Sequence, residues 1–197
     1  MLAVAVVAPS AHSASKTVLV LGDSLSAEYG IRRGSGWVTL LEEKMKQEGI
    51  DANVVNASIS GETTSGGRTR LPALLSRHKP SVVIIELGAN DALRGMPLSS
   101  SEANLRSMVE SAKKADAEPL LVGMKIPPNY GREYTERFSA FYEKVAKDTN
   151  VPLVPFFLEG VAQNPALFQT DRLHPTAEAQ PVMFNNVWPY LKPMLTQ

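Results

Sequence analysis

The chain contains no cysteine among its 197 residues. This absence excludes a thiol nucleophile, a disulfide framework and a metal site built from thiolates. An excess of one charge is also missing, because 20 basic residues are balanced by 20 acidic ones and no run of like charge occurs. We therefore expect no partner that is held by bulk charge, neither nucleic acid nor an anionic membrane surface.

Lysine and arginine are absent before Lys16. The first fifteen residues are apolar and then small, and Ala11-His12-Ser13-Ala14 resembles a signal-peptide cleavage site, although the usual positively charged start is missing. Residues 1–15 are therefore predicted to be the remnant of an export signal or a disordered leader, too short to span a membrane. An export signal implies a periplasmic or secreted protein. The remaining residues, 16–197, have the length of a single domain.

Short apolar runs alternate with amphipathic segments along that domain. Buried strands are expected at residues 18–21, 52–57, 82–87, 120–124 and 151–156. Helical stripes lie between and after them, at residues 34–49, 64–76, 105–112, 138–145 and 184–191, with Pro72 expected to delay or kink its helix. Strands that alternate with helices predict an α/β protein, a three-layer sandwich around a five-stranded parallel sheet.

Residues suited to catalysis follow three of these strands. Ser24 follows the first, Gly61 the second and Asn90 the third. Because the carboxyl ends of parallel strands meet at one edge of a sheet, we expect these residues to share one crevice. Ser24 is the candidate nucleophile, and the backbone N–H groups of Ser24 and Gly61 with the side-chain amide of Asn90 are candidate donors to an oxyanion. The alternatives are ordinary turns, a glycine needed for a positive φ, and an asparagine that serves loop backbone. The neighbouring Asp91 is expected to be a structural cap.

A serine nucleophile requires a base, and the chain has only three histidines. His12 lies in the leader and His78 ends a predicted helix, which leaves His174 in Asp-Arg-Leu-His-Pro. Asp171 is close enough in sequence to orient the imidazole and to stabilise its protonated form. The alternative is that Asp171 only caps the helix that follows Pro175. No second histidine stands at ligand spacing from His174, so we expect no metal site.

The four blocks together resemble a known family. Gly22-Asp23-Ser24-Leu25-Ser26, the block at Gly61, residues 88–91 and residues 171–175 occur in the order and spacing of the GDSL, or SGNH, hydrolases. Residues 56–63, 70–75 and 127–131 look like the bacterial multifunctional thioesterase I branch, also called arylesterase or lysophospholipase. The resemblance implies a flavodoxin-like sheet, a triad of Ser24, His174 and Asp171, an oxyanion hole from Ser24, Gly61 and Asn90, no cofactor and a periplasmic location. Glu28 departs from the family, whose members commonly carry a small residue there, and is expected to affect only the rim of the site.

The sequence thus predicts a monomeric serine hydrolase that cleaves carboxylic esters and acyl thioesters through an acyl-enzyme on Ser24. Two alternatives remain open: a carbohydrate acetylesterase with the same triad, and a non-catalytic module that binds a small molecule in the crevice. Apolar residues near the loops are candidates for an acyl-chain groove, with core packing as the alternative. They are Ile126, Pro127, Tyr130, Phe157 and Leu158.

Overall fold

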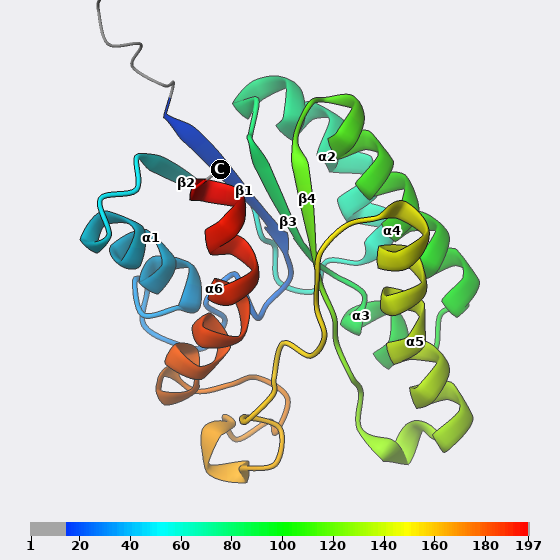
Figure 1. The fold of residues 1–197 in the computed structure, drawn as a ribbon. Helices are drawn as coiled ribbons and strands as arrows, with labels where there is room; N and C mark the ends of the chain where they lie inside the picture. The colour runs from blue at the N-terminus through cyan, green and yellow to red at the C-terminus, as the bar shows by residue number, and fades with distance from the viewer. Residues whose placement is uncertain (1–14, 197) are drawn as a thin grey trace, which may run out of the picture.

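The sheet forms the centre of the molecule. The computed structural model describes residues 15–196, so all of the predicted leader except Ser15 lies outside the described residues. The strands are β1 (Lys16–Gly22), β2 (Ala52–Asn56), β3 (Val82–Glu86), β4 (Glu118–Val122) and β5 (Leu153–Val154). They pair in parallel in the order β2-β1-β3-β4-β5 (Figure 1). The predicted five-stranded parallel sheet is confirmed.

Helices cover both faces of this sheet (Figure 1). On one face lie α1 (Trp37–Gln47) and α6 (Gln180–Thr196), which contact each other. On the other lie α2 (Thr64–His78), α4 (Leu98–Lys114) and α5 (Arg132–Thr149), and α4 contacts both neighbours. Shorter elements are α3 (Ala89–Leu93), η1 (Pro128–Tyr130), η2 (Pro165–Leu167) and η3 (Ala177–Ala179). The predicted three-layer sandwich is therefore correct.

Three details differ from the sequence-based expectation. Helix α2 begins at Thr64 and continues through Pro72, which is exposed, so the proline does not delay its start. Helix α3 directly follows the turn after β3, and its single turn is too short to leave a periodic pattern. Strand β5 has only two residues because Pro152 and Pro155 flank it and have no N–H for a sheet ladder.

The two central strands are buried on both faces. Residues 18–21 of β1 and 82–85 of β3 are at most 1% exposed, and they share one buried core with helix side chains such as Trp37, Phe138 and Tyr142. Burial on both faces explains why these strands are continuously apolar. The result is a rigid base for the loops at the carboxyl ends of the strands.

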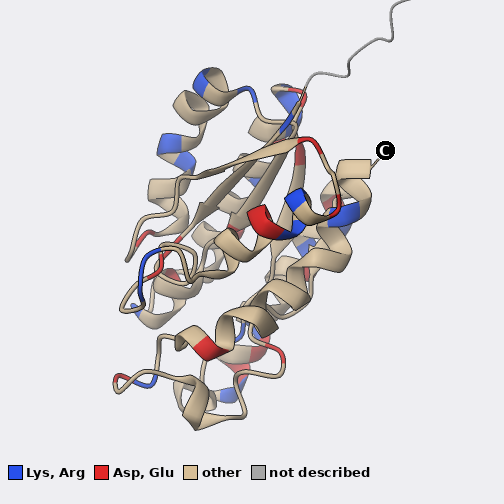
Figure 2. Ribbon diagram, turned by 90° about the vertical axis from the view of Figure 1, so that its left-hand side faces the viewer, with Lys and Arg blue, Asp and Glu red and all other residues tan. Residues whose placement is uncertain are grey.

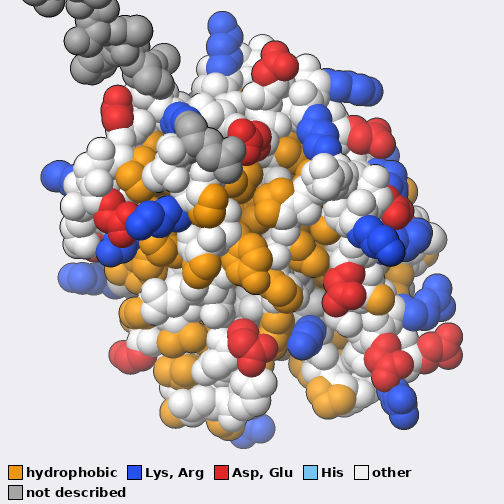
Figure 3. All heavy atoms as spheres, viewed as in Figure 1, with side chains coloured by type: hydrophobic (Ala, Val, Ile, Leu, Met, Phe, Trp, Pro, Cys, Tyr) orange, Lys and Arg blue, Asp and Glu red, His pale blue; other side chains and the backbone are white. Residues whose placement is uncertain are grey.

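The surface agrees with the balanced composition. Basic and acidic residues occur on helices of both layers and on the connecting loops (Figure 2). Hydrophobic side chains gather near the middle of the face seen in Figure 3, with charged side chains around them. Within residues 15–196, no helix combines the length and the apolar character needed to cross a membrane.

Candidate active site

The predicted catalytic residues meet at the carboxyl edge of the sheet. Ser24 lies in the turn after β1, Gly61 in the turn after β2, and Asn90 in the first turn of α3, directly after β3. His174 comes from the loop between η2 and η3, far along the chain. The strand arrows of Figure 1 point toward this edge. Parallel topology thus brings these segments together, as expected for an open α/β sheet.

Three of the side chains form a hydrogen-bonded series. His174 Nε2 lies 3.0 Å from Ser24 Oγ, and His174 Nδ1 lies 2.7 Å from Asp171 Oδ2. With the proton on Nδ1, the imidazole donates to the carboxylate and Nε2 accepts from the serine hydroxyl. The His174 side chain is 22% exposed, so part of it is accessible to solvent. This arrangement can remove the proton from Ser24 as the hydroxyl attacks a carbonyl carbon.

Asp171 is held by its own loop. Its Oδ1 accepts the backbone N–H groups of Leu173 at 2.9 Å and His174 at 3.0 Å, and a tight turn is made possible by a left-handed Arg172, with φ of 58°. These N–H groups and the imidazole lower the pKa of Asp171 to about 2. Among the described residues, the carboxylate makes no bond to η3, so the structure does not support the alternative role as a helix cap.

Two residues that sequence reasoning missed support His174. The Tyr29 ring lies 4.3 Å from the imidazole, centroid to centroid, and is itself 51% exposed. Gln169 Nε2 donates to the carbonyl oxygens of Tyr29 at 2.9 Å and Pro175 at 3.0 Å, while its backbone N–H donates to the His174 carbonyl. Gln169 thereby ties the histidine loop to the loop after β1. No local motif marks either residue, because both contacts join segments about 140 residues apart.

The expected oxyanion donors differ in whether they already have a hydrogen-bond acceptor. The backbone N–H groups of Ser24 and Gly61 donate to no other described residue. Gly61 has a φ of +78°, so the turn also favours glycine at this position, which was the alternative explanation for this residue. Asn90 is engaged: its Nδ2 donates to Asp23 Oδ2 and to the Glu62 carbonyl oxygen, each at 3.0 Å. Two donors have no acceptor among the described residues, and the third has both of its hydrogens on acceptors.

A buried pair of acids lies beneath the nucleophile. Asp23 is 1% and Glu86 2% exposed, and Glu86 Oε2 accepts the Asp23 N–H at 3.2 Å and the Ser26 hydroxyl at 2.7 Å. Burial raises the pKa of Asp23 to about 6, and burial together with the Asp23 charge raises the pKa of Glu86 well above its ordinary value. The sequence signal for this buried pair was Glu86, an acidic residue at the end of the otherwise apolar strand β3. A side chain at Gly22 would approach Glu86 Oε2 to 2.7 Å, so glycine is required there.

Asp91 and Glu28 have structural roles. Asp91 is 1% exposed and accepts from the Thr64 N–H at 2.9 Å and the Ser101 hydroxyl at 3.0 Å, so it joins the start of α2 to α4. The Glu28 carboxylate accepts the N–H groups of Gly34 and Gly36 and thus braces the loop after the serine block. Neither carboxylate contacts the triad, in line with the expectation for each.

The five candidates for an acyl groove separate into two groups. Phe157 is fully buried and packs against Trp37 with 5.4 Å between ring centroids, while Ile126 and Leu158 are less than 9% exposed. These three belong to the core, which was the alternative reading. Pro127 is exposed and Tyr130 is 40% exposed, and both lie at η1. Of the five, only these two offer substantial surface to a substrate.

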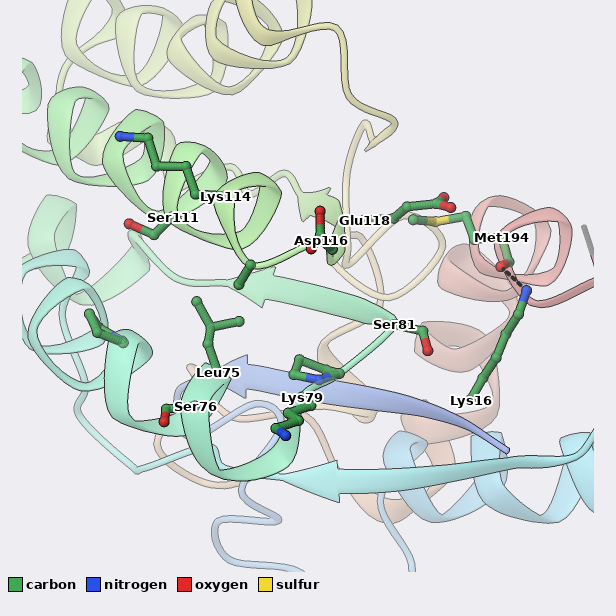
Figure 4. A pocket seen from close by; sticks show the side chains of 13 residues that line it. Lys16, Leu75, Ser76, Lys79, Ser81, Ser111, Lys114, Asp116, Glu118 and Met194 are labelled. Atoms are coloured by element: carbon green, nitrogen blue, oxygen red, sulfur yellow. Dashed lines mark hydrogen bonds between the residues drawn. The ribbon is translucent and has the colours of Figure 1, made fainter. Parts of the chain in front are cut away.

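A cavity of about 850 Å³ lies at the opposite edge of the sheet (Figure 4). Its walls include Lys16, Ser81 and Glu118, near the starts of β1, β3 and β4. Lys16 Nζ donates to the Met194 carbonyl oxygen at 3.0 Å across one side. None of the predicted catalytic residues lines this cavity, so the hydroxyl, imidazole and carboxylate series remains the candidate active site.

A serine, histidine and aspartate in series at the carboxyl edge of a parallel sheet define a serine hydrolase of the α/β class. Residues 20–181 match the GDSL-like Lipase/Acylhydrolase family, and the chain belongs to that family. The enzyme therefore hydrolyses ester bonds, as the resemblance of its four sequence blocks predicted.

Curated relatives and a solved structure match over most of the chain. Esterase TesA of Pseudomonas aeruginosa is 50% identical over 184 residues, covering 93% of this chain and 92% of the relative. Thioesterase 1/protease 1/lysophospholipase L1 of Escherichia coli K12 is 46% identical over 183 residues, covering 93% and 86%. A crystal structure of TesA superposes with a TM-score of 0.90 at 51% identity, covering 91% of this chain and all of that one.

Proposed function

We propose that Ser24, His174 and Asp171 hydrolyse carboxylic esters and acyl thioesters through an acyl-enzyme. The single observation that carries the proposal is the series from Ser24 Oγ to His174 Nε2, 3.0 Å, and from His174 Nδ1 to Asp171, 2.7 Å. Ser24 Oγ attacks the acyl carbon while His174 takes its proton, and the charged imidazole then gives that proton to the departing alcohol or thiol. Water next attacks the acyl carbon while His174 takes its proton, and His174 then returns that proton to Ser24 Oγ as the carboxylic acid leaves.

The tetrahedral intermediates carry a negative oxygen, for which the site has a set of donors. We assign the Ser24 and Gly61 N–H groups, which have no acceptor among the described residues, together with the Asn90 amide. Removal of one such donor from a serine protease lowers turnover about 100- to 1000-fold. The same order of effect is expected here for Asn90→Ala.

The substrate class follows from the relatives and from the exposed side chains. The named relatives are an esterase and a thioesterase that is also a lysophospholipase, which supports both oxygen and sulfur esters of acyl chains as substrates. Pro127 and Tyr130 offer exposed apolar surface at η1 for the acyl chain. The apolar and small residues 1–15 support a periplasmic or secreted enzyme, and we propose that it acts as a monomer without a cofactor.

The test is hydrolysis of p-nitrophenyl esters of increasing chain length, of acyl-CoA thioesters and of acetylated xylo-oligosaccharides. Ser24→Ala is expected to lower kcat by about 10⁴-fold or more on every ester that the wild type hydrolyses. Ser76→Ala, an exposed serine on α2 at the opposite edge, is the matched control. Full turnover by Ser24→Ala would refute the proposed nucleophile. Turnover of acetylated sugars alone would favour the acetylesterase, and no turnover together with no phosphonate labelling of Ser24 would favour a binding module.

A further inference from the structure

The orientation of the Asn90 side chain is determined by two acceptors. Its amide nitrogen lies 3.0 Å from Asp23 Oδ2 and 3.0 Å from the Glu62 carbonyl oxygen. An amide turned by 180° would put its own oxygen against both of these oxygens, with no hydrogen between them. The two acceptors therefore select the orientation in which nitrogen, and not oxygen, is available for an oxyanion.

The two acceptors differ in charge, and therefore in the strength of the hydrogen bond. A hydrogen bond to a carboxylate is about twice as strong as one to a neutral carbonyl. Asp23 is also firmly held: it is buried, its Oδ1 accepts the Leu25 N–H at 3.0 Å, and its own N–H is held by Glu86. Asp23 directly precedes Ser24, so the nucleophile and this anchor belong to one turn. The N–H on the Glu62 carbonyl is thus the one that Asn90 can release at lower cost.

We propose that Asp23 is a positioning residue of the oxyanion hole. Its carboxylate anchors one N–H of Asn90, and the N–H that rests on the Glu62 carbonyl turns to the substrate oxygen as the tetrahedral intermediate forms. No covalent bond changes at Asp23. The inference rests on the proposed function, because it requires an oxyanion produced by attack of Ser24.

The charges around Asp23 are compatible with this role. Asp91 on α3 opposes its ionisation, whereas His174 and the Leu25 and Asn90 N–H groups favour it. Glu86 on β3 faces it, and burial raises the pKa of Glu86 well above its ordinary value. His174 becomes positive as the oxyanion forms, so the reacting state brings a positive charge to the site together with the new negative one.

A double-mutant cycle tests whether Asp23 acts through Asn90. Asp23→Asn is expected to lower kcat for a p-nitrophenyl ester about 10- to 100-fold while KM changes less than about 3-fold, because the lost contact matters mainly in the transition state. In an Asn90→Ala background the same change is expected to cost less than about 3-fold, because the group that it positions is gone. Equal losses in both backgrounds would overturn the positioning role.

Glu86→Gln is the matched control. Glutamine resembles the protonated acid and still offers an oxygen to the Ser26 hydroxyl and the Asp23 N–H, so kcat is expected to stay within about 3-fold. A loss as large as that of Asp23→Asn would assign the effect to the packing of the buried pair and overturn the proposal.

If Asp23→Asn does not fold, Asp23→Ser replaces it, since a serine hydroxyl can still accept the Leu25 N–H. Ser24→Ala separates the two hypotheses. Full turnover by that variant refutes the proposed function. If Ser24→Ala is inactive but the losses caused by Asp23→Asn and Asn90→Ala are additive, only the positioning role is refuted.

Discussion

Asp23→Asn is also expected to change how stability depends on pH. Asp23 is 1% exposed, and burial raises its pKa from 3.8 to about 6. The folded protein therefore holds this proton more tightly than the unfolded chain does. Below pH 3.8 both states are protonated, so the buried acid adds no charge penalty. As pH rises from 3.8 through 6 the folded state must ionise a buried group, and about 3 kcal/mol of stability is lost, since each pKa unit corresponds to about 1.36 kcal/mol.

Urea unfolding of wild type and Asp23→Asn between pH 4 and pH 8 measures this loss. The difference between the two proteins cancels the common titration of groups such as Asp171, whose lowered pKa acts in the opposite direction at lower pH. Repeating both measurements in a Glu86→Gln background removes the titration of the neighbouring Glu86. The wild type is expected to lose about 2.5 kcal/mol relative to the variant over this range, because part of the loss has already occurred at pH 4, or about 5 to 10 °C in Tm. A difference that stays constant with pH would refute the reasoning that a buried carboxyl ionises beneath Ser24.

Three further variants address the surroundings of the site. Asp171→Asn is expected to lower kcat about 100- to 10,000-fold, because it loses the carboxylate that orients and stabilises the imidazole, and near-normal steady-state kinetics would contradict this. With a pKa of about 2, Asp171 should contribute no ionisation to the activity profile above pH 4. Asp91→Ala leaves the buried Thr64 N–H without its acceptor and should lower the free energy of unfolding by about 2 to 4 kcal/mol in urea, so an unchanged midpoint would argue against the role of Asp91. Tyr29→Leu removes the ring beside His174 and should lower kcat/KM about 2- to 5-fold, which is the effect of losing an exposed cation–π contact. An unchanged kcat/KM would show that the ring does not stabilise the protonated imidazole.

Local patterns were sufficient for the layers of the fold and for one of the two hydrogen bonds that join the triad. The continuously apolar runs of β1 and β3 can be recognised because burial on both faces leaves no room for polar residues. Asp171 and His174 can be paired from the sequence because they are three positions apart and the contact closes within one turn. Pro72, by contrast, does not delay the start of α2, which begins at Thr64 and contains the proline.

Contacts between distant segments were decided only by the tertiary structure. Ser24 and His174 are 150 residues apart, and Asp23 and Asn90 are 67 apart, so each meeting depends on strand order and loop path. Phe157 was a candidate for the groove because its side chain is apolar, yet packing against Trp37 places it in the core. The amino-acid sequence by itself determined which segments become strands and helices and which residues are chemically able to act. Periodicity is a local property, whereas the distance between two side chains is set by the packing of the whole sheet, so only the folded chain decided which of those residues touch.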